Sequence, residues 1–420
     1  PLRERGLEHF RIPSDTRSML FGSDIATDYI QPHIGGDFAL LAGIIKILDA
    51  EGDYDQDFVA QHCENTDEFL ESIRKMSWDE IIASSGISLD EIHGLCHLIR
   101  RSKRSIFCWA MGVTHHQHGS DTVRLIANLA MMRGMLKKPG AGLMPLRGHS
   151  NVQGMGSMGV TPQLKTAFFD NVETSLGVKL PQTAGLDTLA CMEQADEHNV
   201  DFAWCLGGNL YDSNPDAQFA AQAMQKIGLI TYLNTTLNLG HLKGRGKETV
   251  ILPVLARDEE TQRTTQESMF SFVRISDGGE SRHKGPLSEV EICSRIAEKV
   301  LGNETINWPS MLQHDAIRGL ISQVVPGFTS ITSEKEFHIP GRHLETEGFP
   351  TTSGKAQFHS FTLPTIRQDN DNDKTTARVQ LMTVRSEGQY NSIVYEEHDR
   401  YRGQDRRDII MLSSADRKRF

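Results

Sequence analysis

The sequence predicts an α/β protein with two parallel sheets, because the same order of elements occurs twice. Residues 105–111 have a short apolar strand pattern, a glycine-bearing loop follows at 112–119, and a helix is predicted from about Ser120 to Leu136, with Ser120 as its N-cap. Strand, glycine loop, helix and strand return over residues 200–255. A strand, a glycine loop and a capped helix in this order are typical of a nucleotide-binding α/β unit.

The composition sets further limits. A chain of 420 residues has room for roughly three domains, and its net charge of −11 argues against an extended surface for nucleic acid. The longest apolar stretch, residues 38–48, is interrupted by Lys46, so we expect no membrane span. The six cysteines are scattered and form no CxxC pair, which is typical of a reduced cytoplasmic protein and predicts no zinc or iron–sulfur site made of neighbouring cysteines.

The two ends favour an internal piece of a longer protein. The chain begins at Pro1 without a methionine, and it stops at Phe420 soon after an apolar, strand-like segment at 409–412. No basic segment followed by an apolar run opens the chain, so the pattern of a signal peptide is not seen. We expect a cytoplasmic location.

Other segments do not follow this order of strand, glycine loop and helix. Residues 137–162 hold six Gly and three Pro, too many for a regular element, and predict a buried loop. Residues 256–285 predict a polar loop, and residues 287–301 an amphipathic helix. Residues 367–378 predict a linker, after which a β-rich unit begins at Val379.

Gly35, Gly36 and Asp37 form a small-residue turn that precedes a predicted helix, whose apolar positions are Leu40, Leu41, Ile44, Ile45 and Leu48. Glycine lets backbone N–H groups approach a phosphate, and a helix N-terminus favours an anion, so this turn is a candidate phosphate site. A plain turn capped by Asp37 is the simpler alternative.

The loop 112–119 contains three histidines, His115, His116 and His118. A zinc site would need a cysteine or carboxylate at suitable spacing, and none is present, so contact with a phosphate or a pterin is favoured over a metal. A solvent-facing polar loop is the alternative.

Arg147 lies between small residues in the glycine-dense loop. A guanidinium in an apolar loop is costly unless it pairs with an anion, and its fork suits a carboxylate or a phosphate. An ion pair with a structural Asp is the alternative, and His149 has the same ambiguity between a catalytic and a structural role.

Further loops occur at 206–216, 258–277, 348–356 and 383–390. Each could be an ordinary loop. Several glycine loops with few carboxylates, placed at strand ends, nevertheless suit a large anionic cofactor that spans domains.

Together these residues resemble the molybdopterin oxidoreductase family, and most of all its formate-dehydrogenase-like alpha subunits. The strongest stretch is WAMGVTHHQHGSDTVRLIANLAMMRGMLKKPGAGLMPLRGHSNVQG, which is similar to the family segment that ends in RGxxNVQG. The segments LGGNLYDSNPD, ILPVLARDEETQRTTQESMFSFVRISDGG, GFPTTSGKAQF and TVRSEGQYN follow in the family's order.

The resemblance implies four domains around a molybdenum or tungsten ion held by two molybdopterin guanine dinucleotides. Residues 1–149 would be most of one Rossmann-like dinucleotide domain, and residues 150–275 the second. Residues 276–375 would return to an iron–sulfur domain, and residues 376–420 would open a β-barrel-like cap domain. The resemblance places the ligands of the 4Fe-4S cluster upstream of this chain.

The resemblance also implies roles for particular residues. Arg147 matches an arginine beside the metal that orients an anionic substrate, and His149 accompanies it as a catalytic candidate. The implied contacts to the dinucleotides come from Gly35, Asp37, Gly112, Val113, Thr114, His115, Asn151, Gln153, Gly154, Gly207 and Asn209, and those of the cap domain from Arg385, Gln389 and Tyr390. No metal ligand is expected in this chain.

The implied function is a two-electron oxidation or reduction of a small anionic substrate, with electrons passed through the cluster to an acceptor protein. The family's catalytic Cys or selenocysteine and its neighbouring His lie upstream, so the piece alone is expected to be inactive. His149 and Ser150 stand where family formate dehydrogenases show Gln-Asn or similar, a departure that counts against formate itself. A non-catalytic scaffold subunit of a redox complex is the alternative, and the lack of G-x-G-x-x-G before a helix counts against a nicotinamide enzyme.

Overall fold

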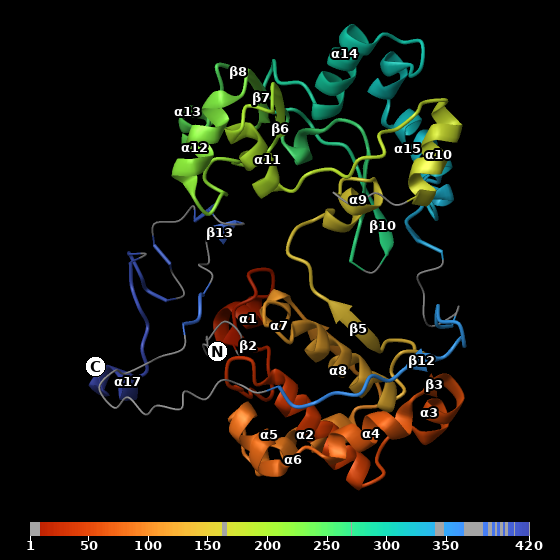
Figure 1. The fold of residues 1–420 in the computed structure, drawn as a ribbon, viewed down its shortest axis with the longest axis vertical. Helices are drawn as coiled ribbons and strands as arrows, with labels where there is room; N and C mark the ends of the chain where they lie inside the picture. Colours follow the sequence, from red (N-terminus) through yellow and green to blue (C-terminus); the bar gives the residue numbers. More distant parts are fainter. Residues whose placement is uncertain are drawn as a thin grey trace. The chain divides into compact units, whose positions relative to one another are not determined.

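The computed structural model describes residues 9–161, 166–269, 271–340, 348–364, 381–384, 389–390, 393–394, 398–399, 402–406 and 408–419. These residues belong to two compact units (Figure 1). Unit 1 comprises residues 1–147, 343–389 and 394–420, and unit 2 comprises residues 148–342 and 390–393. Each unit is described by itself.

Unit 1 is mainly helical. Its elements are β1 (His9–Phe10), α1 (Thr16–Phe21), β2 (Ser23–Asp24), α2 (Asp37–Ala50), α3 (Gln56–His62), β3 (Cys63–Glu64), α4 (Thr66–Arg74), α5 (Trp78–Ser85), α6 (Leu89–Arg101), β4 (Ile106–Trp109), α7 (Met111–Thr114), α8 (Gly119–Met132), β5 (Gly142–Pro145), β12 (Ala356–Gln357) and α17 (Ser414–Arg419). The strand pairs β4–β5 and β3–β12 are parallel, and β1–β2 is antiparallel.

Helix α2 forms the centre of the unit 1 core. It is apolar on most sides because α4, α5, α6 and α8 surround it, and Phe38, Ile45 and Leu48 are at most 1% exposed. Lys46 is the cation that interrupts this apolar helix. Its Nζ donates to the carbonyl oxygens of Arg74 (2.6 Å) and Met76 (2.7 Å), so the charge satisfies backbone acceptors at the end of α4.

Helices α5 and α6 begin with capping boxes, in which a serine and a glutamate three residues later satisfy each other's backbone N–H groups. In α6 the pair is Ser88 and Glu91. The hydrogen bond from the Ser88 hydroxyl, followed by that from its backbone N–H, lowers the pKa of the Glu91 carboxyl.

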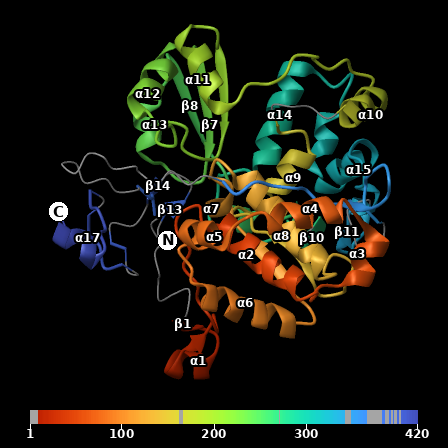
Figure 2. The same cartoon turned by 60° about the horizontal axis from the view of Figure 1, so that its bottom comes forward.

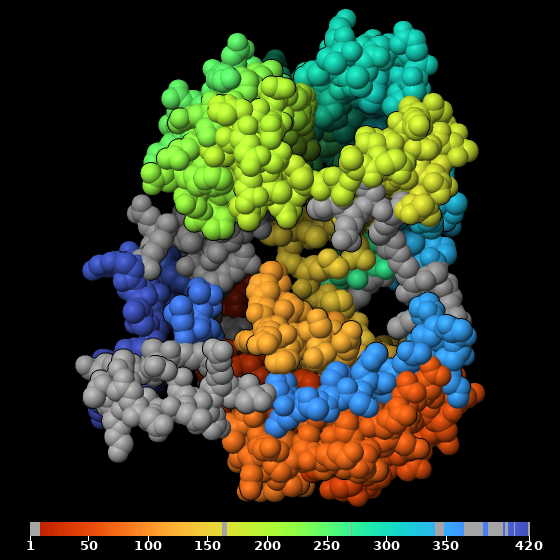
Figure 3. Space-filling view, viewed as in Figure 1, coloured from red at the N-terminus to blue at the C-terminus, as the bar shows by residue number. Residues whose placement is uncertain are grey.

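Residues 348–364 return to the N-terminal helices of unit 1. The ring of Phe358 stacks on Phe69 with centroids 5.0 Å apart, and the ring of Phe361 meets Phe38 edge-on at 5.6 Å. Figure 3 shows this segment lying along the N-terminal helices. Unit 1 is therefore built from distant parts of the chain, and residues 148–342 of unit 2 lie between its first two segments in sequence.

Unit 2 combines a parallel and an antiparallel sheet with several helices. Its elements are α9 (Val152–Ser157), α10 (Thr166–Leu176), α11 (Thr188–Asp196), β6 (Phe202–Leu206), α12 (Ala217–Lys226), β7 (Leu229–Asn234), α13 (Leu239–Lys243), β8 (Glu248–Pro253), η2 (Arg257–Glu259), β9 (Thr264–Glu267), β10 (Phe272–Ser276), α14 (Glu289–Leu301), η3 (Trp308–Leu312), α15 (His314–Val324), η4 (Thr329–Thr332) and β11 (Phe337–His338).

The parallel sheet of unit 2 has the strand order β6-β7-β8, and helices cover both of its faces (Figure 2). Ile230 and Tyr232 of β7 pack with α11 and α12, whereas Leu233 packs with Ile292 of α14 on the opposite face. The burial of β7 on both faces explains why LITYL reads as a continuous apolar run. The predicted strands of residues 200–255 and the predicted helix at 287–301 are confirmed as β6, β7, β8 and α14. The helix predicted after the turn at Gly35–Asp37 is confirmed as α2, which already begins at Asp37.

Two predicted loops contain regular structure, so these predictions were wrong. The glycine-dense segment 137–162 contains β5 and α9, and the polar segment 256–285 contains β9 and β10. Strand β5 pairs with β4, and β10 pairs with the distant β11 as well as with its neighbour β9. These partner strands supply hydrogen bonds that local composition does not reveal.

The predicted N-cap of α8 was also wrong. The helix begins at Gly119, and its N-cap is His118, which makes no side-chain capping bond. A Cβ at Gly119 would lie 2.7 Å from the carbonyl oxygen of Thr114, so the helical turn α7 approaches the start of α8 too closely for another residue. The predicted linker at 367–378 and Val379 lie outside the described residues.

Candidate cofactor site

In unit 2 the loop after β6 leaves its backbone open. Gly207 and Gly208 have φ of +65° and +72°, which favour glycine, and a Cβ on either residue would meet no atom within 4 Å. The N–H of Gly207 donates to the carbonyl of Leu233 (2.8 Å), and the Asn234 side chain donates to the carbonyl of Gly208 (3.1 Å). The loop is thus fastened to β7 at the carboxyl edge of a parallel sheet, where open α/β sheets bind ligands.

Asn209 shapes this loop. Its Oδ1 accepts from the backbone N–H of Asp212 (3.1 Å), and its Nδ2 donates to the Asp212 carboxylate (2.9 Å). A Cβ at Gly240 would overlap Asn209 Oδ1, so Gly240 leaves room for this side chain. The side chain of Asn209 is thus engaged within the protein, and its predicted contact with a dinucleotide stays a prediction.

In unit 1 the two predicted phosphate loops lie together. Gly35 has a φ of +79°, and a Cβ placed on it would lie 3.8 Å from Nδ1 of His116. The turn before α2 and the loop 112–119 are therefore neighbours, although 80 residues of chain separate them. Asp37 stands half-buried in the first turn of α2, where a carboxylate suits the helix dipole.

The loop 112–119 is more regular than predicted. Gly112, Val113 and Thr114 belong to the single turn α7, in which the Thr114 hydroxyl donates to the carbonyl of Met111 (3.1 Å). Gly112 and His115 are exposed, and a Cβ at Gly112 would meet no atom within 4 Å. These positions leave space for a ligand.

Arg147 follows β5 and is exposed, so the cost of burying its guanidinium that the sequence suggested does not arise in the described structure. None of the ion pairs among the described residues includes Arg147, which leaves its guanidinium without a carboxylate partner there. His149 is half-buried.

Residues 150–154 are fastened to the antiparallel sheet of unit 2. Asn151 has a φ of 60° and its Oδ1 accepts from the backbone N–H of Glu267 in β9 (3.0 Å). A Cβ at Gly154 would overlap the same Oδ1, so Asn151 and Gly154 fit each other. Gln153 is half-buried in α9. The Asn151 oxygen thus has a structural role, and the predicted contact of this residue with a pterin stays a prediction.

Arg257 was missed by the sequence analysis. Its guanidinium donates to the Ser150 hydroxyl (2.9 Å) and to the side-chain oxygen of Gln266. It therefore ties the loop after Arg147 to strand β9. Since 107 residues separate Arg257 from Ser150, a single sequence carries no signal of this contact.

The cysteines differ in their exposure. Burial raises the pKa of the Cys63 and Cys205 thiols to about 11 and that of Cys96 to about 12, so all three stay protonated at neutral pH. Cys108 is exposed. Within the part of the chain that the structure describes, no three His, Cys, Asp or Glu side chains are grouped so that they could hold a metal ion.

Of the three residues predicted to contact the cofactor from the cap domain, the structure describes two. Arg385 lies outside the described residues. Gln389 and Tyr390 form β13, which pairs with β14 (Ile393–Val394). Among the described helices, none has the length and apolar character needed to cross a bilayer.

Comparison with known proteins identifies the family. The molybdopterin oxidoreductase family matches residues 14–238, which is more than half of the chain, and this chain belongs to that family. The predicted resemblance is thereby confirmed.

The individual relatives differ from this chain at most positions. The chain is 31% identical to the uncharacterized oxidoreductase Rv2900c of Mycobacterium tuberculosis H37Rv and 32% identical to the protein YdeP of Escherichia coli K12, in each case over the whole chain. It spans 56% and 58% of the length of these two relatives. A putative formate dehydrogenase of Staphylococcus aureus MRSA252 is 25% identical over 79% of the chain and 35% of that protein.

A solved structure shares the fold. Acetylene hydratase from Pelobacter acetylenicus superposes with a TM-score of 0.53 at 17% identity, over 80% of this chain and 49% of that protein. The mixed helix–strand architecture is thus one that occurs in a solved structure. The division into four domains and the individual site residues stay predictions.

Proposed function

We propose that this chain is part of a molybdenum-dependent oxidoreductase that performs two-electron chemistry on a small anionic substrate, as a formate dehydrogenase does. Family membership carries this proposal. The name of a more distant relative, a putative formate dehydrogenase, supports the substrate class. The positive charge of Arg147 in the candidate site is consistent with an anionic substrate.

The described residues fit a pterin dinucleotide. Gly207 and Gly208 offer an open backbone at the carboxyl edge of a parallel sheet, which is a cradle that a Cβ would fill. In unit 1, Gly112 offers the same openness, whereas Gly35 faces His116 of the neighbouring loop. Peptide N–H groups in such loops suit phosphate oxygens. We assign one guanine dinucleotide to each unit, and on this proposal both units contain a Rossmann-like domain.

The residues would divide the work of holding this cofactor. In unit 1 the turn at Gly35 and Asp37 and the loop at Gly112–His115 would hold one dinucleotide. In unit 2 the loop at Gly207–Asn209 would hold the other, and Asn151, Gln153 and Gly154 would contact a pterin. When bound, a molybdenum or tungsten centre supplies the two-electron transfer. Cap contacts would come from Arg385, Gln389 and Tyr390.

Arg147 would orient the substrate. Its exposed guanidinium has no carboxylate partner among the described residues and presents a planar fork to a small anion. His149 stands two residues on and would assist as a donor or acceptor of a proton. A 4Fe-4S cluster held by residues outside this chain and a cytoplasmic acceptor protein would receive the electrons.

The proposal is tested on the full-length protein purified from a host supplied with molybdate and tungstate. We expect molybdenum or tungsten and pterin to copurify with it, and a small oxyanion or carboxylate to reduce a dye in its presence. Purified protein that folds but binds neither metal nor pterin would refute the proposal. Metal and pterin without any turnover would instead favour the scaffold subunit.

A matched pair of glycine variants tests the cradle. Gly208→Ala places a methyl group in the open space of the loop, whereas Gly177→Ala does so at another open position with a φ of +65° after α10. Both variants carry similar backbone strain. We expect pterin content to fall in Gly208→Ala and to stay normal in Gly177→Ala. Equal pterin content in the two variants would contradict the assigned loop.

A further inference from the structure

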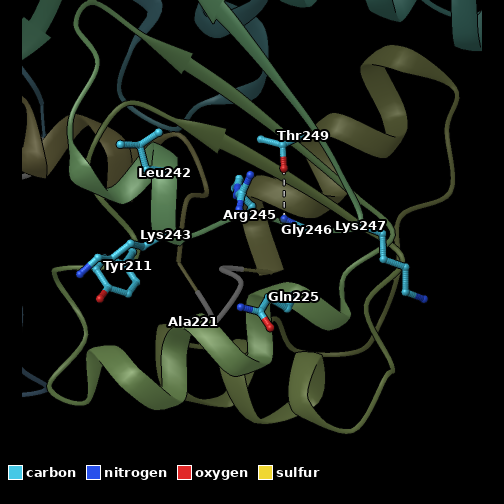
Figure 4. A pocket seen from close by; sticks show the side chains of 9 residues that line it. All are labelled: Tyr211, Ala221, Gln225, Leu242, Lys243, Arg245, Gly246, Lys247 and Thr249. Atoms are coloured by element: carbon cyan, nitrogen blue, oxygen red, sulfur yellow. Dashed lines mark hydrogen bonds between the residues drawn. The ribbon is translucent and has the colours of Figure 1, made fainter.

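A basic pocket lies in unit 2, beside helix α12 (Figure 4). Its cavity volume is about 730 Å³, which is within the range of small-molecule sites. The pocket is lined by Ala221 and Gln225 of α12, by Tyr211 from the loop after β6, and by the segment 242–249. Lys243, Arg245 and Lys247 in that segment supply three positive charges, and no carboxylate lines the pocket.

The three cations are not neutralised by the protein. None of the ion pairs among the residues that the structure describes includes Lys243, Arg245 or Lys247, and all three are exposed. The chain as a whole carries a net charge of −11, so a cluster of one sign here departs from the general charge. Like charges in one pocket repel one another, and a bound anion would remove that cost.

The segment that carries Arg245 is held in place on both sides. Tyr232 of β7 donates its hydroxyl hydrogen to the carbonyl of Gly244, and a Cβ at Gly244 would lie 3.0 Å from that hydroxyl oxygen. The N–H of Gly246 donates to the Thr249 hydroxyl (3.1 Å), as Figure 4 shows. Arg245 stands between these two fixed glycines, so its backbone is preorganised for a ligand.

The pocket differs from the cofactor loops. Thr249 is the second residue of β8 and pairs with Ile230, the second residue of β7, so it lies near the amino ends of the strands. Gly207 follows the last residue of β6, at their carboxyl ends. Residues 245–249 therefore stand toward the edge of the sheet opposite to Gly207 and Gly208. From there the pocket extends to Tyr211, which belongs to the same loop as Gly207 but is not among the residues assigned to the dinucleotide.

We propose that this pocket binds a phosphorylated small organic molecule. A guanidinium and two ammonium groups suit a phosphate, and the hydroxyl of Thr249 and the amide of Gln225 add neutral donors. The ring of Tyr211, whose centroid lies 6.0 Å from Lys243 Nζ, and the side chain of Leu242 offer apolar surface for the organic part. The pocket volume of about 730 Å³ exceeds what a bare phosphate needs, so the pocket has room for the organic part of the ligand.

The test is calorimetric titration of the purified protein at fixed ionic strength with adenosine diphosphate and with inorganic phosphate as probes. We expect adenosine diphosphate to bind more tightly than phosphate. Arg245→Gln and Lys243→Gln should each weaken binding roughly tenfold to a hundredfold, the usual effect of removing one charged hydrogen-bond donor. Lys299→Gln, which removes an exposed cation on α14, should leave the affinity unchanged and serves as the matched control.

Three results would overturn the proposal. The first is no binding heat with either probe at millimolar concentration. The second is an equal loss of affinity in Lys299→Gln, which would mean general charge attraction. The third is binding that Gly208→Ala abolishes and Arg245→Gln leaves intact, since the probe would then occupy the cofactor loop. Melting temperatures of all variants show whether a loss of binding reflects unfolding. The titrations and the melting temperatures can both be interpreted without knowledge of the metal content.

Discussion

Replacement of Arg147 by lysine separates a role in substrate binding from a role in folding. Lysine keeps the positive charge but cannot present two parallel N–H groups to one anion. The lost charged hydrogen bond is worth about 1.5 to 3 kcal/mol, which corresponds to roughly a 10- to 150-fold fall in kcat/KM. Because Arg147 is exposed and has no ion pair among the described residues, its effect on the free energy of unfolding should stay within about 0.5 kcal/mol.

The assay measures metal content, pterin content and turnover on the same samples of the full-length protein. We expect Arg147→Lys to retain normal metal and pterin while activity per bound metal falls. Arg101→Lys, at an exposed arginine in the last turn of α6, is the matched control and should change none of these quantities. Unchanged activity per metal in Arg147→Lys would end the catalytic assignment. Loss of metal and stability together would instead assign Arg147 to holding the loop.

Three further predictions concern the chain itself. Gly154→Ala should destabilise unit 2 by about 1 to 3 kcal/mol in chemical unfolding, because the new methyl group would displace Asn151 from its bond to β9. Ser88→Ala should raise the pKa of Glu91 toward its ordinary value, seen by NMR titration; since that pKa is lowered in the folded protein, its stabilising contribution is present above the unfolded pKa and is lost as pH falls through the folded one. Cys108 should be alkylated before the two buried thiols, Cys63 and Cys96, in mass-spectrometric labelling, and equal rates would contradict the burial described.

Local patterns predicted most regular elements, because periodicity and buried strands leave a clear signal. The apolar spacing of α2 and the run LITYL of β7 are examples. Strands β9 and β10 were missed because TTQE and FVRIS are short and partly polar, and each is stabilised by the other. The start of α8 was missed because the fit of Gly119 against Thr114 depends on α7.

In the candidate site, too, local features could be predicted from the sequence, whereas contacts between distant residues could not. Glycines with positive φ at 35, 207 and 208 could be predicted, since a turn of this kind needs glycine whatever surrounds it. The contact of Arg257 with Ser150 and the engagement of Asn151 with Glu267 could not, because both join residues more than 100 positions apart. The exposure of Arg147 also required the folded chain.

The assembly of unit 1 from segments that are distant in sequence has a consequence for synthesis on the ribosome. The side chain of Gln357 donates to Glu64 across 293 residues of sequence, and the ring that stacks on Phe69 belongs to Phe358. During synthesis, the helices within residues 37–132 leave the ribosome without these partners until residues 148–342 of unit 2 have been made. Unit 2 can therefore complete its fold earlier, while apolar surface around Phe69 waits exposed. Chaperones that bind nascent chains would have their longest opportunity there.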